Sequence, residues 1–178
     1  LNFLVFLLFD HIGGLNTMLN ILSMGATMVI PEKREPESIA KLIQKFKVNI
    51  FPTSPTFLNL MNIGGVFENH DLSSLKLITY GTEPMSENLL NILKNKLSKT
   101  KLIQTFGTSE TGIIKTKSKS SGSLLVKFED NDQEIKIMDG ELWIKSKTMV
   151  LGYINHNNNS FTKDGWFKTG DLVEEKDD

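Results

Sequence analysis

One stretch of the chain, residues 104–112, gathers side chains that can hold a phosphate group and a metal ion. Its sequence is QTFGTSETG, so two glycines, four hydroxyl residues and one carboxylate fall within nine positions. Glycine lets a backbone approach a ligand closely, and hydroxyl and loop N–H groups bind phosphate oxygens. The carboxylate of Glu110 is an oxygen ligand of the kind that Mg²⁺ prefers. An apolar strand is predicted at residues 101–103, just before this stretch. From composition alone, a turn that binds no ligand is as well supported as a phosphate and metal site.

A second polar stretch, near the end of the chain, changes that balance. Residues 164–171 read DGWFKTGD, and with FGTSE at residues 106–110 they resemble two core motifs of the AMP-forming adenylating enzymes. That family includes acyl-CoA synthetases, luciferases and the adenylation domains of peptide synthetases. Further matches follow in the family's order: FDHIGG at residues 9–14, YGTEPM at residues 80–85, and GEL at residues 140–142 with GY at residues 152–153. The resemblance covers essentially the whole chain.

The resemblance implies a two-step reaction on a small-molecule carboxylic acid. The acid attacks the α-phosphate of ATP to give an acyl-adenylate and pyrophosphate, and a thiol, commonly that of coenzyme A, then displaces AMP. Asp171 matches the position that binds the ribose hydroxyls in the family, and Glu110 matches the position that binds Mg²⁺. Ser109 keeps a phosphate-binding hydroxyl where the family usually has Thr. The alternative is that both carboxylates are ordinary turn, cap or surface residues.

The adenine pocket is expected to use two stretches of the chain. Phe106 stands where the family commonly has Tyr, and its ring either stacks on adenine or packs in the core. Gly107 and Thr108 complete this motif, with Thr108 at its variable position. The second stretch is expected to line adenine mainly through its backbone and comprises Gly81, Thr82 and Glu83. Glu83 can equally be a surface residue.

The pocket for the acid is predicted near the early motif and at the ends of two strands. Its expected members are His11, Gly13, Thr53, Ser54 and Thr105. His11 matches a position that borders the acyl pocket in relatives, although an ordinary His after a helix cap fits nearly as well. No histidine metal site is expected, because the three histidines, at positions 11, 70 and 156, share no ligand spacing.

Alternating helix and strand patterns predict an α/β fold over about residues 1–112, with a mostly parallel sheet flanked by helices. Strands are expected at residues 1–9, 26–30, 48–51, 75–80 and 100–106. Asp10 is expected to cap the first helix. Ligands on such sheets gather at the carboxyl ends of the strands, so the segments at residues 53–54, 81–83 and 107–110 are predicted to share one rim.

The remainder, residues 113–178, is predicted to be a truncated, β-rich, barrel-like subdomain of the same adenylation domain. Its short strands are expected at residues 124–128, 134–138, 141–144, 148–153 and 166–173. Asp139 and Gly140 between two of them predict a tight hairpin turn.

Composition excludes several kinds of protein. Lysine and arginine total 20 and aspartate and glutamate 21, so the net charge of −1 gives no field that would favour nucleic acid as a partner. No cysteine is present, which excludes disulfides and thiol nucleophiles and fits a cytoplasmic protein. The apolar residues 1–9 are too few for a transmembrane segment, which needs about 20, so none is expected.

Three hypotheses follow from these matches. The leading one is an internal fragment of an acyl-CoA synthetase, because the family's phosphate loop lies upstream and its C-terminal domain lies downstream of the motifs found here. Such a fragment is expected to be inactive alone. A neighbouring hypothesis is an adenylation domain that loads an acyl-carrier protein. A non-catalytic AMP-binding module is the third, and the presence of both Glu110 and Asp171 argues against it. The acid itself, fatty, aryl or amino, is not specified by the sequence.

Overall fold

The structure is a computed structural model that describes residues 1–118, 123–129 and 132–176. Its first part is a five-stranded parallel sheet in the order β2-β1-β3-β4-β5 with helices in the connections, which confirms the α/β prediction. Its elements are β1 (Asn2–Leu4), α1 (Ile12–Ser23), β2 (Thr27–Val29), α2 (Pro36–Phe46), β3 (Ile50–Thr53), α3 (Pro55–Ile63), α4 (Val66–Asn69), β4 (Leu77–Tyr80), α5 (Glu87–Lys96) and β5 (Lys101–Gln104).

The core of this part lies between the sheet and helices α2, α3 and α5. The strands contribute buried residues such as Phe51, Ile78 and Leu102, and the helices contribute others such as Ile43 and Leu93. The opposite face is covered differently, because Ile21 of α1 packs in a small separate cluster with side chains from β1 and the residue after it. Alternate strand residues point to opposite faces, so β1 serves both clusters.

Local sequence signals set most of the helix ends. Ser54 and Ser86 cap α3 and α5, each accepting a hydrogen bond from a backbone N–H three residues on. The prediction that Asp10 caps α1 is wrong: His11 is the capping residue, with an extended backbone, and its Nδ1 accepts from the Gly13 N–H at 3.0 Å.

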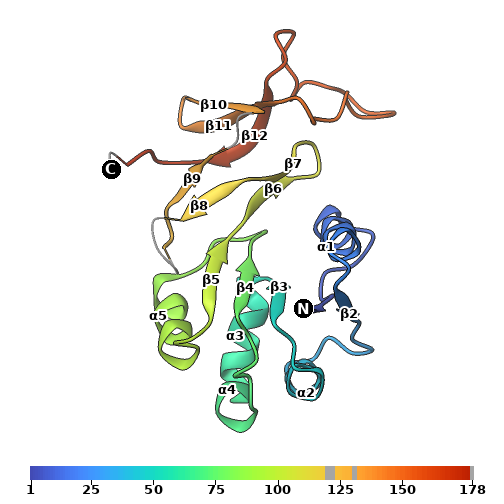
Figure 1. Ribbon diagram of the computed structural model, residues 1–178. Coiled ribbons are helices and arrows are strands. Elements are labelled where there is room, and N and C mark those ends of the chain that lie inside the picture. Colours follow the sequence, from blue (N-terminus) through green and yellow to red (C-terminus); the bar gives the residue numbers. More distant parts are fainter. Residues whose placement is uncertain (119–122, 130–131, 177–178) are drawn as a thin grey trace.

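The second part is built from short antiparallel strands. They are β6 (Phe106–Thr108), β7 (Gly112–Ile114), β8 (Thr116–Ser118), β9 (Val126–Phe128), β10 (Gln133–Met138), β11 (Glu141–Ser146) and β12 (Phe167–Leu172). Figure 1 shows the pairs β6–β7 and β8–β9 between the parallel sheet and the β10-β11-β12 sheet. The predicted turn is confirmed, since Asp139 and Gly140 both have positive φ and join β10 to β11.

Two strand predictions need correction. Residues 148–153 form no strand, because their backbone turns toward Glu110 and Asn158: the N–H groups of Val150 and Tyr153 donate to those residues. The apolar residues 1–9 contain only the three-residue strand β1. The predicted boundary after residue 112 falls inside β7, which pairs with β6. The division into two subdomains there stays a prediction. In the described part of the chain, no helix has the length and apolar character needed to cross a bilayer.

Candidate active site

The carboxyl ends of β3, β4 and β5 form one edge of the parallel sheet. Thr53, Tyr80 and Gln104 are in register across these strands, so the segments that follow them leave the sheet at the same level. The Thr105 backbone N–H and its hydroxyl both donate to the Tyr80 carbonyl, at 2.8 and 3.2 Å. The rim that the sequence predicts is therefore present for the ends of these three strands.

Glu83 joins two of these segments. Its carboxylate accepts from the Thr56 backbone N–H at 2.6 Å and from the Thr56 hydroxyl at 2.7 Å, in the first turn of α3. The Thr56 hydroxyl lowers the pKa of Glu83, and smaller contributions come from the Thr56 N–H and the Ser54 hydroxyl. A negative charge at a helix N-terminus is favourable, so Glu83 has a structural role as a cap.

Gly81 and Thr82 shape the turn that follows β4. A Cβ on Gly81 would lie 2.7 Å from the Thr105 carbonyl oxygen, so only glycine fits against this neighbouring segment. Thr82 has a φ of 71°, a left-handed conformation that non-glycine residues seldom adopt. The close approach at Gly81 is thus made to Thr105, and contact of this loop with adenine stays a prediction.

The predicted phosphate and metal stretch forms a hairpin tip. Strands β6 and β7 pair from Phe106 with Ile114 to Thr108 with Gly112, and the three residues Ser109, Glu110 and Thr111 make the turn between them. Gly112 has a φ of 72°, as the residue after a three-residue turn of this kind requires. The hairpin therefore places Glu110 at the centre of its tip.

Two threonines brace the hairpin from inside. The hydroxyls of Thr108 and Thr111 lie 3.1 Å apart, and each also accepts from the other residue's backbone N–H. Thr111 is buried, with 1% of its surface exposed, whereas Ser109 is exposed. A Cβ on Gly107 would lie 2.5 Å from the Gly112 carbonyl oxygen, so this glycine permits the close pairing of the two strands.

Glu110 is held by a distant segment of the chain. The Tyr153 hydroxyl donates to Glu110 Oε1 at 2.6 Å, and the Val150 N–H donates to the Glu110 carbonyl at 2.9 Å. Partial burial acts to raise the pKa of Glu110, but hydrogen bonds from Tyr153, from its own N–H and from Thr108 outweigh it and lower the pKa below its ordinary value. The same bond raises the pKa of Tyr153. Glu110 is therefore ionised at neutral pH with a neutral tyrosine beside it.

Phe106 contributes its ring to a small apolar cluster. The ring packs edge-on against Phe128 with the centroids 5.6 Å apart, next to the buried side chains of Ile114, Leu142 and Ile144. The residue is partly exposed. Packing is thus one role of this residue, and stacking on adenine stays a prediction.

Asp171 lies near the end of β12, and its side chain is exposed. Its backbone N–H donates to the Thr169 hydroxyl at 3.0 Å, and that hydroxyl donates to the Leu142 carbonyl of β11. The N–H of the preceding residue, Gly170, is bound by the Glu141 carboxylate at 2.9 Å. The neighbouring backbone is therefore fixed while the carboxylate of Asp171 has no hydrogen-bond partner among the described residues.

The predicted acid-pocket residues are buried or have local structural roles. Thr53 is 3% exposed, and its hydroxyl has no hydrogen-bond partner in the described residues. Ser54 caps α3 and His11 caps α1, so both have structural partners. Gly13 is buried in the first turn of α1. Contact of these residues with an acid stays a prediction.

The hairpin tip fits a magnesium ion bound together with a nucleotide. No three His, Cys, Asp or Glu side chains in the described ranges converge as a metal cage. Mg²⁺ is usually bound through one or two carboxylates together with substrate phosphates and water, rather than by an all-protein cage. A single ionised carboxylate, Glu110, beside the exposed hydroxyl of Ser109 is compatible with that mode of binding.

The family is decided by comparison with known proteins. The model of the AMP-binding enzymes matches residues 1–154. The chain belongs to the AMP-binding enzyme family. Among its relatives, 4-coumarate-CoA ligase 1 of Narcissus pseudonarcissus is 29% identical over 190 aligned residues, which cover 91% of this chain and 34% of the ligase. The chain thus spans about a third of the length of the curated relatives that it matches.

Solved structures of adenylating enzymes share the fold. The luciferase-like enzyme of the nonluminescent Zophobas morio mealworm superposes with a TM-score of 0.80 at 26% identity, over 96% of this AMP-binding chain and 45% of that enzyme. The nonribosomal peptide synthetase FmoA3 superposes with a TM-score of 0.80 at 20% identity, over 95% of this chain and 21% of the synthetase. The recognition from sequence motifs is therefore confirmed at the level of family and fold.

Sequence reasoning missed two residues that shape the candidate site. Thr111 braces the hairpin, and Tyr153 binds Glu110. Tyr153 is part of the GY match at residues 152–153, but the motif does not indicate which residue its side chain contacts. A hydrogen bond between residues 43 positions apart has no local sequence signal.

Proposed function

We propose that the protein containing this chain is an AMP-forming acid–thiol ligase, which activates a carboxylic acid with ATP and transfers the acyl group to coenzyme A. The observation that carries the proposal is the hairpin β6–β7, which holds an ionised Glu110 at its tip in a chain of the AMP-binding enzyme family. The relatives named as 4-coumarate-CoA ligases support coenzyme A as the acceptor.

The reaction has two steps that balance without a further reactant. A carboxylate oxygen of the acid forms a bond to the α-phosphorus of ATP while the bond to pyrophosphate breaks. The thiolate of coenzyme A then attacks the acyl carbon, and AMP leaves. When bound, Mg²⁺ neutralises charge on the phosphates.

The chain's own residues have assigned parts in the first step. Glu110 holds the metal ion, and the Ser109 hydroxyl donates to a phosphate oxygen. Asp171, exposed beside a fixed backbone, accepts hydrogen bonds from the ribose hydroxyls. Phe106, which is partly exposed, stacks on adenine.

The acid we propose is an aryl-substituted one of the 4-coumarate type, because the relatives bear that name. Fatty acids are the next candidates. Hydrophobic pockets separate acids that differ by one methylene only about 10–200-fold, so several acids are expected to react. A cytoplasmic location is proposed from the absence of cysteine.

The second candidate is an adenylation domain that loads an amino or aryl acid onto a carrier protein. The structural likeness to a nonribosomal peptide synthetase favours it. The two candidates share the first step and differ in the thiol that accepts the acyl group.

An exchange assay on the intact protein tests the proposal. Incorporation of labelled pyrophosphate into ATP is measured with Mg²⁺ and a panel of 4-coumarate, cinnamate, fatty acids and amino acids. The expected result is exchange that depends on an aryl acid, followed by release of AMP when coenzyme A is added. AMP release with a carrier protein alone would favour the second candidate, and binding of AMP without exchange for any acid would contradict both.

Glu110→Gln in the intact protein sharpens the assignment of the metal ligand. The change keeps the shape of the side chain but removes the charge that a hard cation favours, so we expect the exchange rate at low Mg²⁺ to fall at least about 10–100-fold, the range for residues that only orient a metal ligand. Raising Mg²⁺ should restore part of the rate. Glu129→Gln, at an exposed carboxylate on the surface, is the matched control. Wild-type rates for Glu110→Gln at low Mg²⁺ would remove Glu110 from the metal site.

A further inference from the structure

The segment of residues 150–153 forms two hydrogen bonds with Glu110. The Tyr153 hydroxyl binds the carboxylate at 2.6 Å, and the Val150 N–H binds the carbonyl of the same residue at 2.9 Å. Glutamate has a long side chain that loses much rotamer freedom when it is ordered. These two hydrogen bonds therefore order both the backbone and the side chain of Glu110 before a ligand binds.

Tyr153 is itself anchored from two sides. Its backbone N–H donates to Asn158 Oδ1 at 2.6 Å, and its ring packs against Phe161 with the centroids 5.2 Å apart. A Cβ at Gly152 would lie 2.7 Å from the same Asn158 oxygen, and Gly152 has a φ of 148°. Only glycine therefore allows this turn to bring the tyrosine over the hairpin tip.

The contacts continue from Tyr153 to the strand that carries Asp171. Phe161 packs on Phe167 with the ring centroids 5.1 Å apart, and the two residues form an antiparallel bridge. Phe167 is buried and begins β12, near whose end Asp171 lies. Three aromatic rings thus connect the Glu110 hairpin with the Asp171 strand.

We propose that Tyr153 is a positioning residue that acts through Glu110: it holds one carboxylate oxygen so that the other meets the metal ion of a bound nucleotide. This inference rests on the proposed function and adds to it a residue outside the motifs that contain Glu110 and Asp171. Ordering a ligand group in advance favours binding, because less freedom is lost on association. The ring contacts with Phe161 keep the tyrosine in place when its hydroxyl is removed, so the hydroxyl can be tested separately.

Binding of Mn²⁺ gives a readout that does not depend on turnover. Mn²⁺ uses the same carboxylate and phosphate ligands as Mg²⁺, and its free fraction is measured by electron paramagnetic resonance with the intact protein and a non-hydrolysable ATP analogue. Tyr153→Phe is expected to raise the Kd for Mn²⁺ about 10–100-fold, the range for residues that orient a metal ligand. Thr148→Val is the matched control, because it removes a hydroxyl of the same region that bonds Ser146 instead of Glu110.

A double variant separates positioning from a merely structural role. If Tyr153 acts through Glu110, the double variant Tyr153→Phe and Glu110→Gln should bind Mn²⁺ no more weakly than Glu110→Gln alone. Unchanged affinity in Tyr153→Phe, or losses that add in the double variant, would overturn the inference and leave the proposed function standing. A wild-type protein that binds neither Mn²⁺ nor the nucleotide analogue would overturn both.

A second variant tests the inference if Tyr153→Phe does not fold. Should Tyr153→Phe unfold at the assay temperature, Asn158→Ala removes only the acceptor of the Tyr153 backbone N–H. The Kd for Mn²⁺ is then expected to rise by a smaller factor, about threefold to tenfold, below the 10–100-fold range for loss of the orienting group itself. Wild-type affinity in that variant would count against the inference.

Discussion

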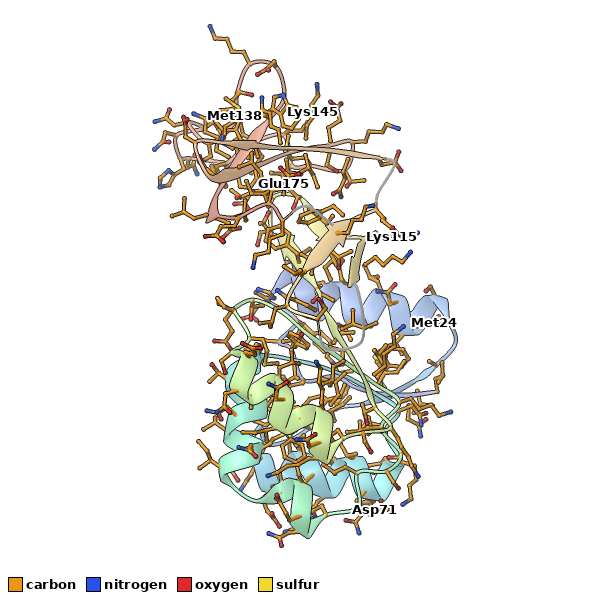
Figure 2. The ribbon with its side chains drawn as sticks, turned by 90° about the vertical axis from the view of Figure 1, so that its left-hand side faces the viewer. Met24, Asp71, Lys115, Met138, Lys145 and Glu175 are labelled. Carbon is orange, nitrogen blue, oxygen red and sulfur yellow. The ribbon has the colours of Figure 1, made fainter. Side chains whose placement is uncertain are left out.

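The parallel sheet and the antiparallel strands of this chain are stabilised in different ways. The sheet is covered by α2, α3 and α5 over one continuous buried cluster. In the antiparallel part, the corresponding cluster contains three buried residues, Ile114, Leu142 and Ile144, with partly buried apolar side chains around them. Figure 2 shows the two parts at opposite ends of the molecule, with Asp71 at one end, Met138 and Lys145 at the other and Lys115 between.

The difference matters because the candidate ligand-binding carboxylates lie in the part with the smaller core. Glu110 is placed by a tyrosine hydroxyl, and the backbone beside Asp171 is placed by the hydroxyl of Thr169 and the carboxylate of Glu141. Hydrogen bonds and ring contacts, more than burial, set these positions. Changes in the antiparallel part should therefore affect ligand binding first, and changes in the parallel part should affect global stability first.

The largest effect is expected for Asp171→Ala in the intact protein. Two hydrogen bonds to a charged acceptor contribute roughly 3–5 kcal/mol together, so the affinity for AMP should fall by about 100-fold or more. Isothermal titration with AMP measures this. The exposed Glu174→Ala is the matched control, with an expected change of less than about threefold on the scale of surface substitutions. Unchanged AMP affinity in Asp171→Ala would remove that residue from the ribose site.

A pair of isoleucine truncations tests the contrast in core size directly. Ile78 in the parallel sheet and Ile144 in the antiparallel part are both fully buried. Each Ile→Ala change is expected to cost about 2–5 kcal/mol, with Ile78→Ala at the upper end because helices pack on that face of the sheet. Denaturant unfolding of the intact protein measures the free energy of unfolding of each variant. Hydrogen exchange measures the protection of each strand.

The pattern of exchange decides the outcome of this pair. Ile144→Ala should reduce protection in β10, β11 and β12 while β3, β4 and β5 keep theirs, because local units open independently when few buried contacts join them. Equal loss of protection in both sheets after either change would show that the two parts unfold as one unit, which would contradict the comparison.

The smallest effect is expected at the rim, where Glu83 caps α3. Glu83→Ala should lower the free energy of unfolding by about 0.5–2 kcal/mol, the range for lost helix caps. Because the folded protein lowers the pKa of Glu83, this contribution is complete above the ordinary glutamate pKa of about 4.3 and is lost as the pH falls through the lower folded value.

The test is thermal or denaturant unfolding of wild type and variant at pH 7 and at about pH 3, below the ordinary glutamate pKa. The stability difference should shrink in acid. Glu32→Ala, at an exposed carboxylate, is the control and should change little at either pH. A difference that stays constant or grows in acid would show that the charge of Glu83 does not act on α3.

The sequence by itself determined the family, the alternation of helices and strands, and the candidate ligand-binding carboxylates. The family and the carboxylates follow from the order of short motifs along the chain. Local signals suffice for the helices and the turn: apolar periodicity for α2, serine caps for α3 and α5, and Asp139-Gly140 for the β10–β11 turn. Each of these local signals depends on residues within a few positions of one another. The capping of α1 lay at the limit of such signals, because Asp10 and His11 both supply a side-chain acceptor and only the backbone conformation distinguishes them.

Only the tertiary structure decided how Glu110 is held and what Glu83 binds. Tyr153 reaches Glu110 across 43 positions, and Glu83 reaches Thr56 across 27. It also decided that residues 148–153 are not a strand, since their N–H groups bond to Glu110 and Asn158 instead of to a neighbouring strand. These contacts follow from packing between distant segments, and local propensity carries no information about which segments will meet.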